Sequence, residues 1–308
     1  MPQKVVCDVD TGGDDAVAIL TVGHSPRTEL VAVTVVGGNA PLQVTLENTL
    51  KVVEHGRLAH VPVYAGAAYP LISEPPQLDP TQERHLKLPP ATLPAQSKRA
   101  AEFLADYYMS EAGPETILVP TAPLTNIALA LRLEPLIARR IPRIVTMGGA
   151  YIEGNTTPSA EFNIYADPEA AHIVYSAGIP ITMIGLEVTS QALITLEDAA
   201  HIRTLGTPQA RIAGDLIAEE VQWFIDNLGW HSGQVYDACA AIGAVEPSVI
   251  KTRPMHVAIE LTGTHTRGRT VADISGTHFK SMPPNVDVGV GIDHVRFMQL
   301  LEEALSQV

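Results

Sequence analysis

The sequence predicts an α/β fold built on an open, mostly parallel, Rossmann-like sheet with helices on both faces. Two observations carry this prediction. Short runs rich in Val and Ile recur along the first two thirds of the 308-residue chain, and longer amphipathic stretches separate them. Near-continuous β-branched runs are typical of parallel strands buried on both faces, and their alternation with helices indicates a helix-covered sheet. Because ligands bind beyond the carboxyl ends of such strands, we expect the active site at that edge.

The predicted elements alternate in chain order. The strands are residues 5–9, 30–36, 116–119, 144–147 and 181–184, and the helices are residues 14–22, 44–54, 98–109, 124–133 and 168–176. Residues 65–94 are rich in Pro and lack periodicity, so they predict a long surface loop of the kind that often serves as a lid or binding loop. No linker-like or strongly charged segment divides the chain, and we expect residues 1–308 to form one domain.

Charge and composition limit the partners that the chain would bind. The formal net charge is −14, and an acidic surface repels nucleic-acid backbones and anionic membranes. No apolar run approaches the length that crosses a bilayer, and no signal-peptide pattern begins the chain. Cys7 and Cys239 lie in apolar contexts that predict buried free thiols, which are consistent with a reducing cytoplasm. We therefore expect a cytoplasmic enzyme with small neutral substrates and with neither nucleic-acid nor membrane partners.

Four aspartates, Asp8, Asp10, Asp14 and Asp15, surround the turn after the first predicted strand. Strand alternation places Asp8 and Asp10 on one side, and the two glycines that follow permit a sharp reversal toward the next helix. Helix capping needs only one carboxylate, whereas like charges packed so closely need a compensating cation or proton. Oxygen ligands without a nearby His or Cys predict Ca²⁺ or Mg²⁺.

Polar or Gly-rich segments also follow the other predicted strands, and together they resemble a known family. Residues 8–16 (DVDTGGDDA) resemble the N-terminal signature of inosine-uridine-type nucleoside hydrolases. Five further segments follow in the family's order, namely 37–39 (GGN), 120–126 (PTAPLTN), 147–150 (MGGA), 154–168 (GNTTPSAEFNIYADP) and 236–238 (YDA). The resemblance spans residues 5 to about 245. It implies a calcium-dependent enzyme of nucleoside salvage that hydrolyses purine or pyrimidine ribonucleosides to ribose and free base, assembled as a homodimer or homotetramer.

The resemblance also implies a metal site and a general base. Asp10, Asp15 and Asp237 would bind Ca²⁺ through their carboxylates, and Thr121 would bind it through its backbone carbonyl. That carbonyl places no demand on the Thr121 side chain, whose other interpretation is a simple turn residue. The metal would hold a water and lower its pKa, and Asp10 would accept the proton of that water.

The contacts to substrate that the resemblance implies come from Asp14, Asn39, Met147, Asn155, Glu161, Asn163 and Asp237. Amides and carboxylates suit a polyol because they satisfy hydroxyl groups directionally. Asp14 would accept a hydrogen bond from the 2′-hydroxyl, and Asn155 and Glu161 would bind the 5′-hydroxyl. Asn39 and Asn155 also have the simpler interpretation of turn residues, and Met147 that of a core residue.

One departure from the family concerns the leaving base. Many members carry a histidine immediately before the C-terminal metal-binding aspartate, and this histidine is assigned to protonating the base. Here the position is Tyr236, which would donate a proton more weakly than imidazolium, stack on the base, or form the pocket wall. Other candidates for the base pocket are Trp223, Phe224, Trp230 and His231, with core packing as the alternative for the first two, and His85 in the long loop.

Two other functions fit parts of the sequence. Residues 8–11 (DVDT) match the first motif of Mg²⁺-dependent haloacid dehalogenase-type phosphohydrolases, with Asp8 as nucleophile and Asp10 as acid. That interpretation leaves Asp14, Asp15 and Asn39 without a role. Tyr236 instead suggests a non-catalytic nucleoside-binding protein, although the complete set of calcium ligands argues against it.

Overall fold

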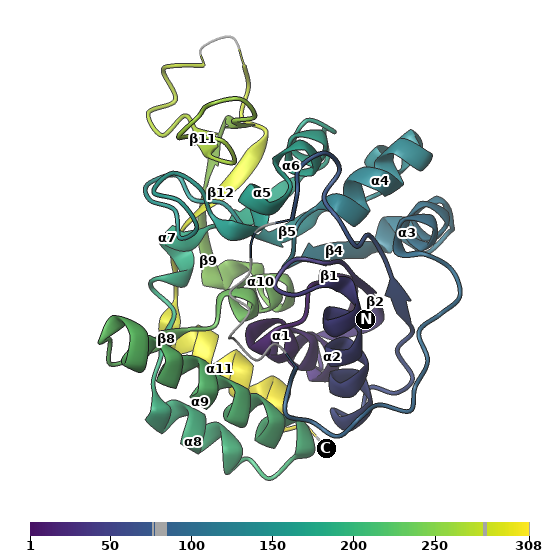
Figure 1. Ribbon diagram of the computed structural model, residues 1–308, viewed down its shortest axis with the longest axis vertical. Coiled ribbons are helices and arrows are strands. Elements are labelled where there is room, and N and C mark those ends of the chain that lie inside the picture. The colour runs from purple at the N-terminus through teal and green to yellow at the C-terminus, as the bar shows by residue number, and fades with distance from the viewer. Residues whose placement is uncertain (76, 78–84, 280–281, 308) are drawn as a thin grey trace.

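The computed structural model describes residues 1–75, 77, 85–279 and 282–307 (Figure 1). The strands are β1 (Gln3–Val9), β2 (Thr28–Val35), β3 (Val63–Ala65), β4 (Thr116–Pro120), β5 (Ile144–Met147), β6 (Ile181–Ile184), β7 (Leu193–Ile194), β8 (Gly233–Gln234), β9 (Ile250–Met255), β10 (Val257–Ile259), β11 (Thr270–Ala272) and β12 (Val286–Ile292).

The α-helices are α1 (Gly13–His24), α2 (Leu42–His55), α3 (Ala100–Met109), α4 (Thr125–Leu133), α5 (Phe162–Ala166), α6 (Pro168–Tyr175), α7 (Leu186–Thr189), α8 (Leu196–Arg203), α9 (Pro208–Leu228), α10 (Tyr236–Val245) and α11 (His294–Leu305). Short 3₁₀-helices are η1 (Gly113–Glu115), η2 (Pro135–Arg139) and η3 (Pro247–Val249).

The central sheet has eight strands in the order β3-β2-β1-β4-β5-β6-β12-β9. Every neighbouring pair is parallel except β12 and β9, which run antiparallel at one edge. The chain runs outward from β1 to β3 on one side and from β4 to β6 on the other. The predicted open, mostly parallel sheet is therefore confirmed, and its order reverses between β1 and β4, where ligands bind in folds of this type.

Hydrophobic cores fill both faces of the sheet, because successive strand residues point to opposite sides. On one face Val5, Cys7 and Val9 pack in a cluster with residues of α1, α9, α10 and α11, whereas Val6 and Leu118 pack on the other face with residues of α3, α4 and α6. Figure 1 shows these helices covering the sheet from both sides. Cys7 and Cys239 are buried and free, as the sequence predicts.

The predicted strands and helices agree with the structure to within a few residues. The long loop is also confirmed, because the described residues between β3 and α3 form no helix or strand. No strand was predicted at residues 63–65 or beyond residue 184, so β3, β9 and β12 are additions that complete the sheet. None of the described helices has both the length and the apolar character needed to cross a membrane.

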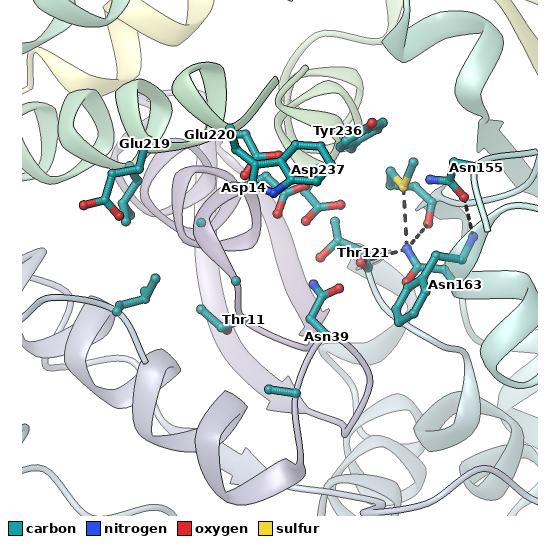
Figure 2. A pocket seen from close by; sticks show the side chains of 18 of the residues that line it. Thr11, Asp14, Asn39, Thr121, Asn155, Asn163, Glu219, Glu220, Tyr236 and Asp237 are labelled. Atoms are coloured by element: carbon teal, nitrogen blue, oxygen red, sulfur yellow. Dashed lines mark hydrogen bonds between the residues drawn. The ribbon is translucent and has the colours of Figure 1, made fainter. Parts of the chain in front are cut away.

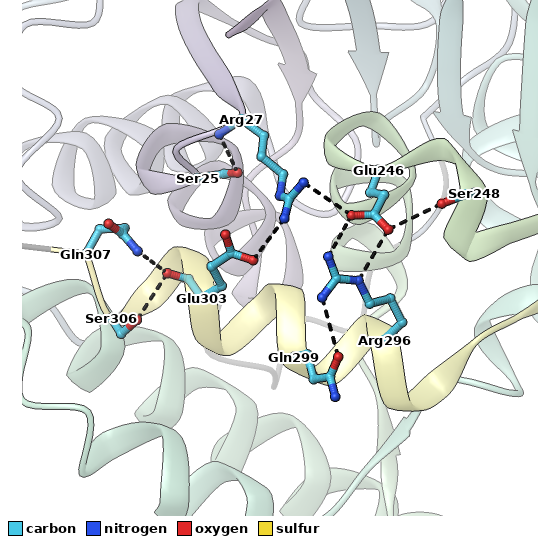
Figure 3. A network of polar contacts seen from close by, with 9 residues as sticks. All are labelled: Ser25, Arg27, Glu246, Ser248, Arg296, Gln299, Glu303, Ser306 and Gln307. Carbon is cyan, nitrogen blue, oxygen red and sulfur yellow. Dashed lines mark hydrogen bonds and ion pairs between the residues drawn. The ribbon is translucent and has the colours of Figure 1, made fainter.

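The C-terminal helix α11 is tied to the rest of the chain by a small ion-pair network (Figure 3). Arg296 donates to Glu246 over 2.8 Å, and Arg27 lies 3.4 Å from both Glu246 and Glu303. Partly exposed pairs of this kind contribute about 0–1 kcal/mol each. The buried side chains of α11, among them Phe297 and Leu301, therefore hold the helix in place more strongly than the ion pairs do.

Candidate active site

The acidic turn after β1 lies at the point where the strand order reverses. The N–H of Thr121, the residue after β4, donates to the carbonyl of Asp8 over 2.9 Å, so the two strand ends are adjacent. Helix α1 begins at Gly13, and Asp14 and Asp15 occupy its first turn, where carboxylates favour the helix dipole. Asp15 also accepts the N–H of Gly12 over 3.0 Å. The Asp15 carboxylate is therefore held against the backbone of the turn, whereas the Asp14 side chain lines the neighbouring cavity.

Three carboxylates from opposite ends of the chain meet at this turn. Asp237 lies in the first turn of α10, which packs against α1. One carboxylate oxygen each of Asp14, Asp15 and Asp237 lies within 4.8 Å of the other two. The structure thus brings the C-terminal aspartate beside the N-terminal acidic turn, although more than 200 residues separate them in sequence.

Asn39, which follows β2, connects Asp10 to this cluster. Its backbone N–H donates to Asp10 Oδ2 over 2.6 Å, and its side-chain amide donates to Asp10 Oδ1 over 3.4 Å and to Asp15 Oδ2 over 3.3 Å. A Cβ atom on Gly38 would lie 2.1 Å from Asp10 Oδ2, so only glycine allows this approach. Asn39 is therefore more than a turn residue, because it holds two of the predicted metal ligands.

The Thr121 side chain has a role that the sequence analysis did not foresee. Its hydroxyl donates to Asp15 Oδ1 over 2.8 Å, and its carbonyl accepts the side-chain amide of Asn163 over 3.0 Å. A carbonyl oxygen has two lone pairs, so this hydrogen bond leaves one for a metal ion. Thr121 thus contacts the cluster through its hydroxyl and offers its carbonyl beside it.

The four acids of the site hold their protons more tightly than ordinary aspartates. Burial is the largest cause, and repulsion between neighbouring carboxylates adds to it for Asp10, Asp15 and Asp237. These effects raise the pKa of Asp14 and that of Asp15 to about 7, and they raise the pKa of Asp10 and Asp237 as well. A divalent cation would remove this repulsion, and a set of oxygen donors suits a hard one. The residues present therefore fit a Ca²⁺ or Mg²⁺ ion.

Glu161 and Asn163 are both buried. The Glu161 carboxylate accepts the N–H groups of Gly149 and Asn163, each over 2.8 Å, and that of Ile164 over 3.2 Å. Glu161 therefore caps the short helix α5, and its acceptor sites are only partly used. Gly149 has a φ of 85°, in the left-handed region that favours glycine, which lets its N–H meet this carboxylate.

The side-chain amide of Asn163 is anchored to backbone at the ends of two neighbouring strands (Figure 2). It donates to the carbonyls of Thr121 and Met147, over 3.0 and 3.2 Å. Met147 is buried, with only 3% of its surface exposed. Asn155 is exposed, and its side-chain oxygen accepts the N–H of Phe162 over 2.9 Å, so its amide hydrogens are the part left for a ligand.

These groups line one cavity of about 670 Å³, a size typical of small-molecule sites (Figure 2). The predicted site residues that line it are Asp14, Asn39, Thr121, Met147, Asn155, Glu161, Asn163, Tyr236 and Asp237. Asp10 and Asp15 are fully buried and contact Asn39, which faces the cavity. The structure thus brings the predicted site residues together, with Asp10 and Asp15 buried behind the residues that line the cavity.

Aromatic side chains form one end of the cavity. Tyr236, Phe224 and Trp223 line it, and the Phe224 and Tyr236 ring centroids lie 6.4 Å apart. Phe224 is buried and Trp223 is 44% exposed, so Phe224 packs in the core and also forms part of the cavity wall. Trp230 stacks on Phe224 at 5.1 Å, but neither it nor His231 is among the lining residues.

The long loop also contributes residues to this cavity. His85 lines it, and its Nδ1 lies 3.5 Å from a carboxylate oxygen of Glu47. Lys87 also lines the cavity and pairs with Glu219 of α9 over 2.9 Å. The prediction that this loop is a binding loop therefore agrees with its position.

Two lining residues, Glu219 and Glu220, were missed by the sequence analysis. Both lie on α9, where consecutive glutamates in an amphipathic pattern are usually a solvated face. Packing of α9 against α1 places Glu220 beside the acidic turn instead. Sequence alone offers no signal for this, because the contact joins residues about 200 positions apart.

Asp8 does not belong to the cavity. It is fully buried, and its Oδ1 accepts the Thr34 hydroxyl over 2.5 Å and the Asn126 amide over 2.8 Å. Burial raises its pKa to about 7. A nucleophile must reach its substrate, but the Asp8 carboxylate is held against Thr34 of β2 and Asn126 of α4, and it has no contact with Asn39 like that of Asp10. This position removes the basis for a phosphohydrolase with Asp8 as nucleophile.

Comparisons with known proteins agree with this geometry. The model of the family described as "Inosine-uridine preferring nucleoside hydrolase" matches residues 5–299. The pyrimidine-specific ribonucleoside hydrolase RihB of Escherichia coli (strain SE11) is 39% identical over 307 residues, covering 98% of this chain and 97% of that protein. A solved purine-preferring ribonucleoside hydrolase from Gardnerella vaginalis is 31% identical, covers 98% of both chains and has a TM-score of 0.87. A solved inosine-guanosine nucleoside hydrolase is 28% identical, covers 99% of both chains and has a TM-score of 0.88.

Proposed function

This chain belongs to the inosine-uridine preferring nucleoside hydrolase family and is a ribonucleoside hydrolase, and from that premise we propose a calcium-dependent mechanism for it. The reaction is hydrolysis of the N-glycosidic bond to ribose and free base. The observation that carries the proposal is the convergence of Asp14, Asp15 and Asp237 beside Asn39 and Thr121 in one cavity.

Asp10, Asp15 and Asp237 would hold the ion through their carboxylates, and Thr121 through its carbonyl. Bound Ca²⁺ would supply a positive centre for the ribose diol and for one water, whose pKa it would lower. Asn39 keeps Asp10 and Asp15 in fixed orientations through its three hydrogen bonds. Asp14 faces the cavity rather than Asn39, and we assign it to the sugar.

The carboxylate of Asp10 accepts the proton of the attacking water. The N–H of Asn39, 2.6 Å from Oδ2, holds this carboxylate in place during the transfer. The oxygen of the water then forms a bond to C1′ as the C1′–N bond breaks.

The ribose would be held by groups on both sides of the cavity. Asp14 accepts a hydrogen bond from the 2′-hydroxyl, and the side-chain oxygen of Asn163 accepts a hydrogen bond from another ribose hydroxyl. Glu161 and the amide hydrogens of Asn155 bind the 5′-hydroxyl. Because the sugar becomes cationic in the transition state, the surrounding carboxylates stabilise it more strongly than they stabilise the bound substrate.

The aromatic end of the cavity would receive the base. Tyr236, Trp223 and Phe224 offer apolar faces there, and His85 of the long loop lines the same cavity. The 39% identical relatives are described as pyrimidine-specific and the 31% identical structure as purine-preferring. Uridine and cytidine are therefore the first substrates to assay, followed by inosine, adenosine and guanosine.

Chromatographic product analysis tests the proposed function. Incubation with calcium and each of the five nucleosides should release the free base and ribose from at least one of them. Release of phosphate from monoesters instead, or tight nucleoside binding without turnover, would contradict it. We further propose a cytoplasmic homodimer or homotetramer that acts in nucleoside salvage, and light scattering of the purified protein tests the assembly.

A further inference from the structure

The departing base leaves the sugar more easily as a neutral molecule than as an anion, so the cavity needs a proton donor at its aromatic end. Tyr236 lines that end, but a phenol, with an ordinary pKa of about 10, is a weaker acid than a carboxyl group or an imidazolium.

Glu220 lies at the same end of the cavity. It comes from α9 and lines the cavity together with Asp14 of α1 and Tyr236 of α10, and Figure 2 shows the three near one another. Its side chain is only partly exposed. Among the residues that the structure describes, the side chain of Glu220 forms no hydrogen bond or ion pair, so its carboxyl group is available to a ligand.

Its neighbour Glu219 has a different environment. Glu219 is exposed at the cavity mouth, where its carboxylate pairs with Lys87 over 2.9 Å. Among the described residues no ion pair joins Glu220 to a cation, and its carboxylate repels that of Asp14. Burial raises the pKa of Glu220 to about 7, so a large fraction of its side chains carry a proton at neutral pH.

We propose that Glu220 is the catalytic acid that protonates the leaving nucleobase. The assignment rests on the ribonucleoside hydrolysis proposed above. As the C1′–N bond breaks, its electron pair stays on the base, and the Glu220 proton moves to a ring nitrogen or carbonyl oxygen of that base. The attacking water gives its oxygen to C1′ and one proton to Asp10. Asp10 then releases its proton to solvent and Glu220 takes one up, so the cycle is balanced.

In this arrangement the two proton transfers occur on opposite sides of the sugar. Asp10 lies behind Asn39 at the floor, and Glu220 lies on α9 beside the aromatic residues. Tyr236 then serves as an apolar wall against the base rather than as its acid. Two carboxyls with different surroundings thereby perform the base and acid functions, a division found in other hydrolases of glycosidic bonds.

The test compares two leaving groups on the same sugar. p-Nitrophenyl β-D-ribofuranoside releases a stable phenolate and needs no proton, whereas a natural base does. Glu220→Gln should lower kcat on the best nucleoside of the panel by about 100-fold or more, the range for loss of an acid catalyst. The same variant should hydrolyse the nitrophenyl riboside at nearly the wild-type kcat.

Three further variants make the result decisive. Asp215→Asn removes a carboxylate of α9 that pairs with Arg203 over 2.9 Å and does not line this cavity, and it should leave both substrates nearly unaffected. Glu220→Asp retains an acid and should recover part of the nucleoside rate, provided that circular dichroism shows every variant folded. Tyr236→Phe should retain more nucleoside activity than Glu220→Gln.

Equal losses on both substrates in Glu220→Gln, or no loss on the nucleoside, would overturn the assignment of Glu220. A loss confined to the nucleoside in Tyr236→Phe would transfer the role to Tyr236 and also overturn it. If the wild-type protein hydrolyses neither substrate, the proposed function fails instead, so the two failures are distinguishable.

Discussion

The hydroxyl of Thr121 donates a 2.8 Å hydrogen bond to Oδ1 of Asp15. This contact joins the end of β4 to the first turn of α1 across the point where the strand order reverses. It also lowers the pKa of Asp15, whose burial has the opposite and larger effect. The hydroxyl therefore helps Asp15 to remain ionised and available to a metal ion.

Replacing Thr121 by Val should weaken calcium binding while leaving the backbone carbonyl in place. A hydrogen bond to a charged group contributes about 1.5–3 kcal/mol, so the calcium concentration needed for half-maximal activity should rise by about tenfold or more. Thr121→Ser retains the hydroxyl and serves as the matched control. Identical calcium activation curves for wild type and Thr121→Val would show that this hydrogen bond does not support the site.

Replacing Asp10 by Asn should lower kcat strongly while the protein remains folded. The amide keeps the shape of the carboxylate and can still accept the Asn39 N–H, but it cannot accept the proton of water. We expect kcat to fall by at least about 100-fold in saturating calcium. Near-normal kcat under that condition would mean that another group accepts the proton.

The metal-free protein should become less stable as the pH rises from about 4 to 7. The pKa of Asp14 and that of Asp15 are raised to about 7, above the unfolded value of about 3.9. Between these values the folded chain binds more protons than the unfolded chain, so raising the pH favours unfolding. Calcium binds the ionised carboxylates and should reverse this loss.

Thermal unfolding with EDTA and with excess calcium tests this at pH 5 and pH 7.5. The increase in Tm caused by calcium should be larger at pH 7.5, because fewer protons compete for the carboxylates there. Magnesium at the same concentration should have a smaller effect, since a site built from carboxylates and a carbonyl suits the larger ion. An equal calcium shift at both pH values would contradict the account of the cluster.

Much of the sheet could be predicted from the sequence because its strands are buried on both faces. Their Val-rich and Ile-rich runs report that burial directly, as in the core residues Val5 and Val33. Strand β9 has the opposite character, since its residues 251–254 are exposed and it contains Pro254 at an edge. Edge strands of this kind lack a clear hydrophobic pattern, so their pairing depends on the partner strand.

The site was predictable where one loop carries several polar groups, as in the turn with Asp10, Asp14 and Asp15. It was less predictable where a side chain acts through tertiary contact. The Thr121 hydroxyl and Glu220 both reach the acidic turn only because β4 and α9 pack beside it. Glu161 shows a third case, because its carboxylate caps α5 through backbone N–H groups that sequence reasoning did not consider.

The central claim is that the metal and Asp14 would bind the ribose diol directly. The most direct test is the ratio of kcat/KM for a ribonucleoside to kcat/KM for its 2′-deoxy counterpart. Without the 2′-hydroxyl, Asp14 and one metal position lose their partner. Sites built around a substrate hydroxyl reject analogues that lack it by about 10⁴–10⁵-fold. A deoxyribosyl bond is intrinsically easier to break, but the lost positioning should outweigh that advantage. We predict a ratio within this range, with the same base and saturating calcium, whereas comparable kcat/KM values for the two substrates would contradict the mechanism.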